Sequence, residues 1–96
     1  MIPRFADGDW VRISLRTERR HHRVPAYAKG QVGVVERVCD DLFHPPEEIA
    51  FGDSGRWEHV YRVRLRQTDL WPEYGGPEHD CLELEIFEHW LEAADE

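Results

Sequence analysis

The chain has 96 residues, of which 41% are hydrophobic and 33% are charged, and its formal net charge at pH 7 is −8. These values predict a single domain, residues 1–96, and they disfavour nucleic acid as the main partner because phosphates would be repelled. No apolar run approaches the roughly 20 residues that span a membrane, and the N-terminus lacks the apolar core of a signal peptide. Two widely separated cysteines, Cys39 and Cys81, also favour a reduced, cytoplasmic protein.

Alternation of apolar and polar side chains predicts short strands separated by loops rich in glycine and proline. The predicted strands cover residues 11–15, 31–38, 61–65, 82–86 and 91–92. We also expect a loop over residues 40–55 and a 3₁₀ turn over residues 88–90, and Gly33 predicts a bulge or a close backbone approach. With almost no helix, this pattern predicts an all-β fold, a small barrel of about five strands.

The chain carries a basic loop, residues 16–27, although its total charge is negative. Residues 1–38 have a net charge of +4, whereas residues 39–96 have a net charge of −12. The cationic positions of the loop are all arginine, whose planar fork pairs with oxyanions and tolerates burial at interfaces. The loop is either solvated, with acids elsewhere balancing it, or it recognises an anion or a partner protein. Arg23 is the sharpest candidate, because the approach to Pro25 steers its backbone toward an extended, stiff geometry.

The sequence contains no self-contained catalytic or metal-binding motif. Its histidines and cysteines do not fall at the spacing of metal ligands, and the adjacent His21 and His22 would diverge on an extended chain. No serine lies in a nucleophile-elbow context, and the glycines do not form a phosphate loop. We therefore do not expect a metal site built by this chain alone.

Four tryptophans and three tyrosines are many for a barrel of this size. Trp10 is out of phase with the apolar residues of its strand, so it should face the other side, and Trp71 lies in a predicted aromatic turn over residues 70–77. The surplus aromatics either mark a protein interface or plug the ends of the barrel, and the sequence leaves both interpretations open.

Ordered motifs along nearly the whole chain resemble the C-terminal, SH3-like half of nitrile hydratase β subunits. The opening motif, similar to the family's Phe-x-x-Gly-Asp-x-Val-Arg, is Phe5-Ala6-Asp7-Gly8-Asp9-Trp10-Val11-Arg12. The loop and the second strand match as His21-x-Arg23-x-Pro25-x-Tyr27, Gly30, Gly33 and Val34. The later motifs are Val60-Tyr61-x-Val63, Leu70-Trp71 and Trp90-Leu91-Glu92. The resemblance implies a small SH3-like barrel with long loops and a short 3₁₀ turn near the C-terminus.

The resemblance also implies an activity. In that family a partner α subunit holds cobalt(III) or iron(III) through a Cys-x-x-Cys-Ser-Cys run with two oxidised cysteines, and β-subunit arginines hydrogen-bond the oxidised sulfurs. Arg23 corresponds to one of these arginines and is therefore the expected catalytic residue of this chain. The expected interface residues are His21, Tyr27, Trp71 and Tyr74. The chain would be a subunit of a lyase that hydrates a nitrile to an amide, inactive alone and without a cofactor of its own.

Two departures from the family pattern refine this expectation. The helical N-terminal half of the β subunit is missing, as in relatives that divide this subunit between two polypeptides, the toyocamycin nitrile hydratase type and thiocyanate hydrolase. The expected partners are therefore a metal-binding α-type subunit and a helical subunit of the β N-terminal type. Residues 50–52, 70–74 and 82–86 look like thiocyanate hydrolase, whereas residues 23–27 look like nitrile hydratases. Lys29 stands where the family usually has arginine, which weakens any role for a fork-like donor there.

Other functions share parts of this pattern. Besides the small subunit of thiocyanate hydrolase, a maturation or subunit-exchange accessory protein on the same barrel is an alternative. A KOW-type barrel of ribosomal and transcription proteins is another, because it shares two short motifs with this chain. These motifs are Gly8-x-x-Val11-x-Ile13 and Lys29-Gly30-x-x-Gly33-x-Val35. They cover only two strands, and the acidic net charge argues against binding of nucleic acid.

Overall fold

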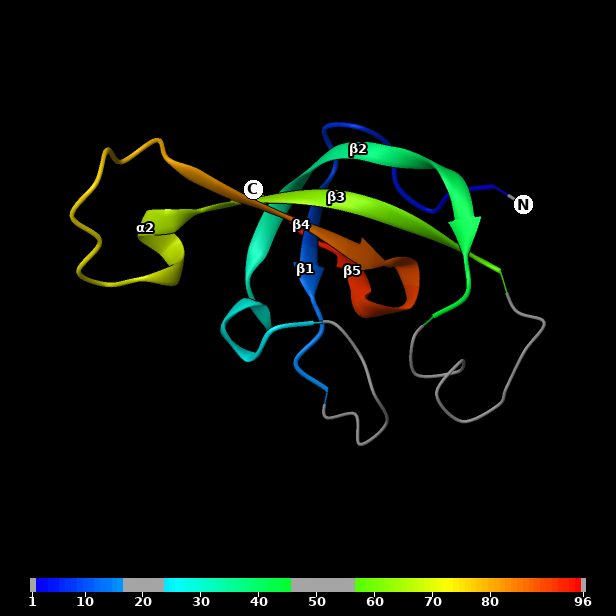
Figure 1. The fold of residues 1–96 in the computed structure, drawn as a ribbon, viewed down its shortest axis with the longest axis horizontal. Helices are drawn as coiled ribbons and strands as arrows, with labels where there is room; N and C mark the ends of the chain where they lie inside the picture. Colours follow the sequence, from blue (N-terminus) through cyan, green and yellow to red (C-terminus); the bar gives the residue numbers. More distant parts are fainter. Residues whose placement is uncertain (1, 17–23, 46–56, 96) are drawn as a thin grey trace.

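The computed structural model describes residues 2–16, 24–45 and 57–95, which form one curved sheet of five strands (Figure 1). The strands are β1 (Trp10–Ile13), β2 (Val32–Phe43), β3 (Glu58–Arg66), β4 (Cys81–Phe87) and β5 (Leu91–Ala93). Their order across the sheet is β4-β3-β2-β1-β5, and every neighbouring pair is antiparallel. The short helical turns are η1 (Ala26–Ala28), α2 (Gln67–Leu70) and η2 (Glu88–Trp90). None of the described helices is long and apolar enough to cross a membrane.

The predicted all-β class, the five strands and the 3₁₀ turn near the C-terminus are confirmed. Three predicted boundaries are wrong by two residues or more, one of them the start of β3, which is Glu58 instead of residue 61. Leu15 lies outside β1 and is 73% exposed, because beside it the Ser14 hydroxyl accepts the backbone N–H of Arg16, a local bond that competes with strand pairing. The second strand continues to Phe43, into the expected loop, because residues 42 and 43 pair with the start of β3. The rest of that loop, from residue 46, lies outside the described residues.

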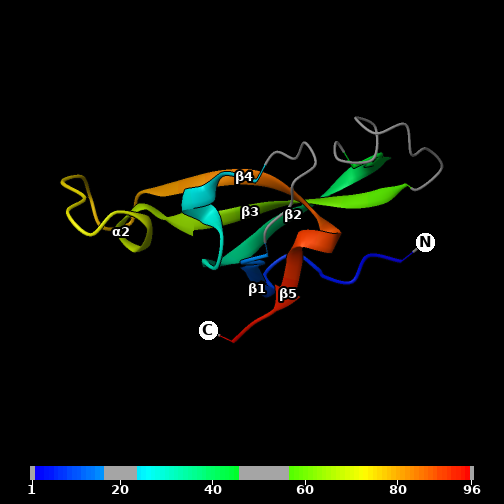
Figure 2. The same cartoon turned by 90° about the horizontal axis from the view of Figure 1, so that it is seen from below.

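The core lies on one face of the sheet, and η2 packs against it as the sheet curls from β4 toward β5 (Figure 2). Along β3, Val63 and Leu65 are at most 1% exposed while Arg64 and Arg66 face solvent, as strand alternation requires. The buried core residues are Phe5, Val11, Ile13, Val24, Ala28, Val35, Tyr61, Val63, Leu65, Leu70, Ile86, Trp90 and Leu91.

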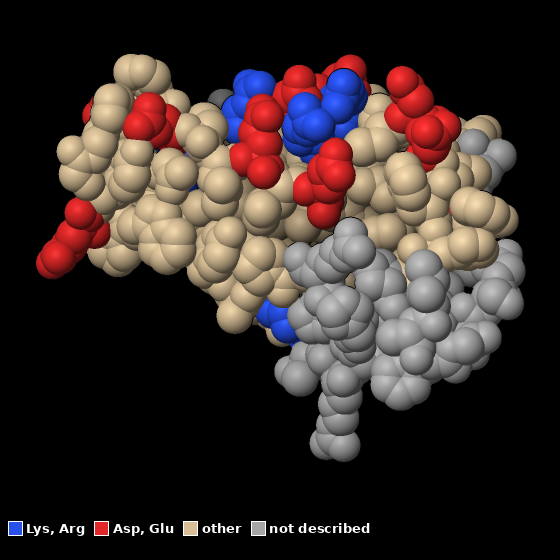
Figure 3. Space-filling view, viewed as in Figure 1, with Lys and Arg blue, Asp and Glu red and all other residues tan. Residues whose placement is uncertain are grey.

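The opposite face of β3 and β4 carries a ladder of ion pairs. The register places Arg62 opposite Glu85 and Arg64 opposite Glu83, with charged atoms 3.4 and 3.0 Å apart. Basic and acidic side chains accordingly interleave along the upper part of the molecule in Figure 3. Exposed pairs of this kind contribute about 0–1 kcal/mol each, so the ladder specifies strand register more than it stabilises the fold.

Gly33 in β2 makes the close backbone approach that the sequence predicts. A Cβ at this position would lie 2.5 Å from the carbonyl oxygen of Arg64 and 2.7 Å from Cδ2 of Leu65. The carbonyl belongs to the paired strand β3, and Leu65 is buried, so neither group can yield easily. The two irregularities in strand pairing lie further along β2, between Val35 and Arg37 and between Val38 and Leu42, so Gly33 permits a close approach and does not form a bulge.

Gly33→Ala is expected to destabilise the isolated domain by about 1–3 kcal/mol, because the added methyl group would overpack the β2–β3 contact. Gly75→Ala is the matched control, because nothing lies within 4 Å of a Cβ added there. The control should stay within about 0.5 kcal/mol of the wild-type free energy of unfolding. Urea unfolding followed by tryptophan fluorescence measures both variants. Equal stabilities for the two would contradict the close approach at Gly33.

Candidate functional site

The basic loop is described only at its two ends. Arg23 and His21 belong to residues 17–23, outside the described ranges, so their expected roles stay predictions. Val24, the next residue, is buried in the core, and Pro25 is extended at φ −66° and ψ 144°. The C-terminal end of the loop is therefore fixed to the core by Val24, and the proline ring restricts the backbone at Pro25.

The buried Trp90 contacts the first residue of the loop and a lysine just beyond its last residue. The guanidinium carbon of Arg16 lies 4.1 Å from the centre of the Trp90 ring, and Nζ of Lys29 lies 5.2 Å from it. Contacts of this kind stabilise by about 0.5–2 kcal/mol each. Gly30 then turns the chain at φ +80° and donates its backbone N–H to the carbonyl of Ile13 at 2.7 Å. Lys29 thus places its ammonium group over an aromatic ring. This contact needs only a positive charge and not the two parallel N–H groups of an arginine.

Tyr27 and Trp71 form an exposed pair beside this loop, called the aromatic pair below. Their ring centres are 5.2 Å apart with planes at 40°, yet the two residues are 39% and 41% exposed. Tyr27 comes from η1, whose Ala28 is buried, and Trp71 follows α2, whose Leu70 is buried. Two turns anchored in the core therefore hold two predicted interface residues together at the surface.

Tyr74, a third predicted interface residue, lies in the same 71–80 loop but is half-buried. Its hydroxyl donates a hydrogen bond to Oδ2 of Asp80 at 2.5 Å, and this bond raises the pKa of Tyr74 above its usual range. A Cβ on Gly76 would lie 2.5 Å from the Tyr74 hydroxyl oxygen, so the ring packs closely over that glycine. Within this structure Tyr74 shapes the loop that carries Trp71, and its role in docking stays a prediction.

The four tryptophans divide between the two interpretations that the sequence leaves open. Trp90 is 1% exposed and plugs the core, and Trp10 is half-buried. Trp57 and Trp71 are 51% and 41% exposed, and they lie beyond the two ends of β3. Trp57 packs against the ring of His44, with ring centres 3.9 Å apart. Exposed aromatic side chains therefore lie near both ends of β3. Exposed apolar surface of this kind is typical of proteins that bind a partner.

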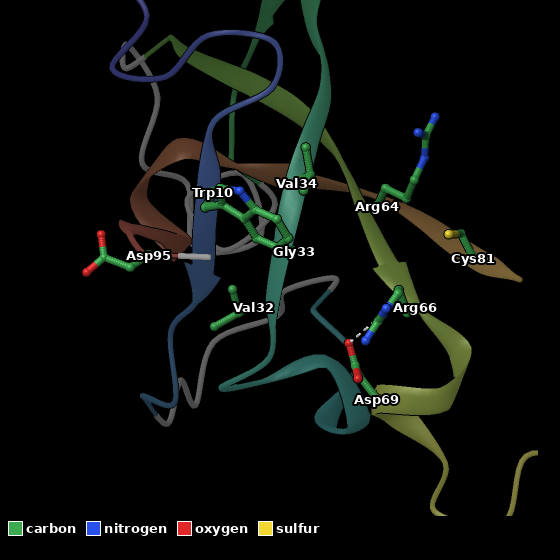
Figure 4. A pocket seen from close by; sticks show the side chains of 9 residues that line it. All are labelled: Trp10, Val32, Gly33, Val34, Arg64, Arg66, Asp69, Cys81 and Asp95. Carbon is green, nitrogen blue, oxygen red and sulfur yellow. Dashed lines mark hydrogen bonds and ion pairs between the residues drawn. The ribbon is translucent and has the colours of Figure 1, made fainter. Parts of the chain in front are cut away.

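The outer face of the sheet holds an open groove of about 650 Å³ (Figure 4). Its floor is apolar: Trp10 of β1 lies opposite Val34 of β2, on the side away from the core, as the strand phase predicts. On one rim Arg66 pairs with Asp69 at 3.4 Å, and Asp95 lies on the other rim. No motif in the sequence marks this groove, and the out-of-phase Trp10 is the only signal that points to it.

The described residues do not fit a metal centre. Within residues 2–16, 24–45 and 57–95, no three His, Cys, Asp or Glu side chains gather to hold a metal ion. Buried Glu58 accepts the backbone N–H of His89 at 2.7 Å and contacts its Nδ1, which joins β3 to η2. Cys39 and Cys81 are free thiols, and burial raises the pKa of Cys39, so its thiolate is disfavoured.

Tyr61, part of a family-like motif, has a packing role. It is fully buried, donates its hydroxyl to Oε2 of Glu88 at 2.5 Å and accepts the backbone N–H of Phe5 at 3.3 Å. Burial, together with the hydrogen bond to Glu88, raises the pKa of Tyr61 to about 12. The neutral phenol is therefore the state that holds the N-terminal segment and η2 onto β3.

Comparison with known proteins identifies the class. Residues 1–93 match the family model described as nitrile hydratase beta subunit, C-terminal. The chain belongs to this family, in agreement with the resemblance of its motifs.

Individual relatives come from two kinds of enzyme. The chain is 36% identical to thiocyanate hydrolase subunit alpha of Thiobacillus thioparus, over 95% of this chain and 72% of the relative. It is 31% identical to a nitrile hydratase subunit beta of Pseudomonas chlororaphis, over 96% of this chain but only 41% of the relative. The fold matches the recombinant apo-enzyme of Thiobacillus thioparus thiocyanate hydrolase with a TM-score of 0.88 and 35% identity, covering 97% of this chain and 78% of the other.

Proposed function

We propose that this chain is a subunit of a multi-subunit, nitrile hydratase-type enzyme that adds water to a C≡N bond, and that it is inactive alone. The family match over residues 1–93 carries this proposal. The chain spans less than half the length of the nitrile hydratase β subunit that it matches. The predicted reaction is the hydration of a nitrile to an amide, in the cytoplasm.

The metal of this enzyme would belong to a partner. Some relatives are named as cobalt-containing nitrile hydratase subunits, and the described residues of this chain offer no cluster of metal ligands. The partner would be an α-type subunit that binds cobalt(III) or iron(III) through oxidised cysteines, joined by a helical subunit of the β N-terminal type. The aromatic pair, Tyr27 and Trp71, is the surface best suited to dock such a partner, because it is exposed and rigidly held.

Arg23 would be this chain's contribution to the reaction centre. In the sequence it directly precedes Val24, which is buried, and Pro25, whose backbone is extended. A guanidinium can direct two parallel N–H groups at the oxygens of oxidised cysteines and orient them. The role is electrostatic and positional, and it requires no proton transfer by Arg23.

A thiocyanate hydrolase is the second candidate, and one observation favours it. The chain is 36% identical to the thiocyanate hydrolase subunit and 31% identical to the nitrile hydratase β subunit, and its fold matches the thiocyanate hydrolase structure with a TM-score of 0.88. The two substrates share a C≡N group, and the surfaces contributed by other subunits would select between them.

Co-expression with a neighbouring gene product that carries a Cys-x-x-Cys-Ser-Cys run tests the proposal. Amide formation from nitriles supports the first candidate, and ammonia release from thiocyanate supports the second. An accessory protein would instead raise the metal content or activity of the partner and then dissociate. An RNA mobility shift by the isolated chain would favour the KOW-like alternative, which the net charge of −8 disfavours.

A further inference from the structure

Trp71, one member of the aromatic pair, begins a loop, residues 71–80, whose charged side chains are all carboxylates. From residue 67 to residue 96 the chain contains ten Asp or Glu residues and no Lys or Arg. In the 71–80 loop, Glu73 and Glu78 are exposed, and neither has an ion-pair or hydrogen-bond partner among the described residues, whereas Asp80 accepts the hydroxyl of Tyr74. Acidic side chains are visible at this α2 end of the molecule in Figure 3.

The loop that displays these carboxylates is shaped by its own contacts. The backbone N–H of Gln67 donates to the carbonyl of Asp80 at 2.9 Å and closes the base of the loop. Nε1 of Trp71 donates to Oε1 of Gln67 at 2.7 Å, and the Tyr74 backbone N–H donates to the Trp71 carbonyl at 3.1 Å. A loop held in this way loses little conformational entropy when it binds, which favours a docking role.

Two independent features of this surface indicate which chemical groups a partner protein would present to it. Exposed faces of tryptophan and tyrosine attract guanidinium groups, and unpaired carboxylates bind them through forked hydrogen bonds. The chain itself provides an example, since Arg16 stacks on Trp90 at 4.1 Å. A symmetric pairing of two copies through this loop is disfavoured, because the two acidic loops would repel each other.

We propose that the aromatic pair, with Glu73 and Glu78, docks onto an arginine-bearing surface of the metal-carrying partner subunit. This inference rests on the proposed function, because the partner is the one named there. The aromatic rings supply the apolar contact area, and the two carboxylates fix the orientation and accelerate the encounter.

The test compares two double variants that remove the same charge. The loop variant, Glu73→Gln with Glu78→Gln, removes the two exposed carboxylates of the 71–80 loop. The control variant, Glu92→Gln with Asp95→Asn, removes two exposed carboxylates in and just after β5. Affinity for the purified metal-carrying subunit is measured at low and high salt. We expect the loop variant to bind about 5–10-fold more weakly at low salt, with a smaller salt dependence, and the control to bind within about twofold of wild type.

The outcomes separate this inference from the proposed function. If the wild-type chain binds the metal-carrying subunit but the loop variant binds equally well, the arginine-bearing surface is refuted while the subunit assignment stands. Equal weakening in both variants also refutes it, because bulk charge would then explain the effect. A wild-type chain that does not bind that subunit at all would overturn both proposals.

Discussion

Replacing Arg23 with lysine is expected to lower the turnover of the assembled enzyme about 10–100-fold, the usual scale for losing a contact that orients a metal ligand. Lysine keeps the positive charge but cannot present two parallel N–H groups to the oxygens of an oxidised cysteine. The loss should appear in kcat with the complex intact, because the proposed role of Arg23 is at the reaction centre and not in assembly. Steady-state kinetics together with size-exclusion chromatography of the complex measures both properties.

Arg19→Lys and Arg20→Lys are the matched controls, because they lie on the same basic loop but outside the family motif. We expect both to retain nearly full turnover and to assemble normally. Equal losses in all three variants would mean that the loop acts through its total charge. Unchanged turnover in Arg23→Lys would remove this residue from the reaction centre altogether.

The second large effect is expected at Trp71. Trp71→Ala should weaken association with the metal-carrying subunit by about 2 kcal/mol or more, roughly 30-fold, because a docked tryptophan dominates the energy of an interface. The isolated domain should remain folded, since the side chain is 41% exposed and its main ring contact is the equally exposed Tyr27. Titration of the partner subunit, with thermal unfolding of the isolated chain, measures the two expectations.

Trp57→Ala is the control for this variant, because Trp57 is 51% exposed but precedes β3 at the other end of that strand. Its effect on association should be much smaller than that of Trp71→Ala. If Trp71→Ala unfolds the isolated domain, Trp71 belongs to the core and not to an interface. If both variants weaken association equally, docking is not localised to the aromatic pair.

The alternation of apolar and polar residues correctly predicts those strand segments in which burial of one face is the main determinant of the conformation. Val63 and Leu65 alternate with arginines and are buried, and Gly33 lies where only a missing side chain permits the approach of Arg64. Leu15 fits the same pattern but falls outside β1, because a local hydrogen bond of Ser14 ends the strand. Alternation cannot foresee such a competing local bond.

The candidate site is only partly accessible to sequence reasoning. Motif order singles out Tyr27 and Trp71 separately, but their contact depends on how η1 and α2 are placed by the core, which no local pattern encodes. Tyr74 has the same kind of sequence signal, yet its bond to Asp80 makes it half-buried. Similarly, the groove at Trp10 arises from the alignment of neighbouring strands.

The central claim is that this chain is a metal-free subunit of an enzyme whose metal is held by a partner. Elemental analysis of the subunits, separated after co-expression and purification of the complex, tests it most directly. We expect cobalt or iron to remain with the α-type subunit and to be absent from this chain, with activity only in the complex. Stoichiometric metal bound to the separated chain, or C≡N hydration by the chain alone, would contradict the account.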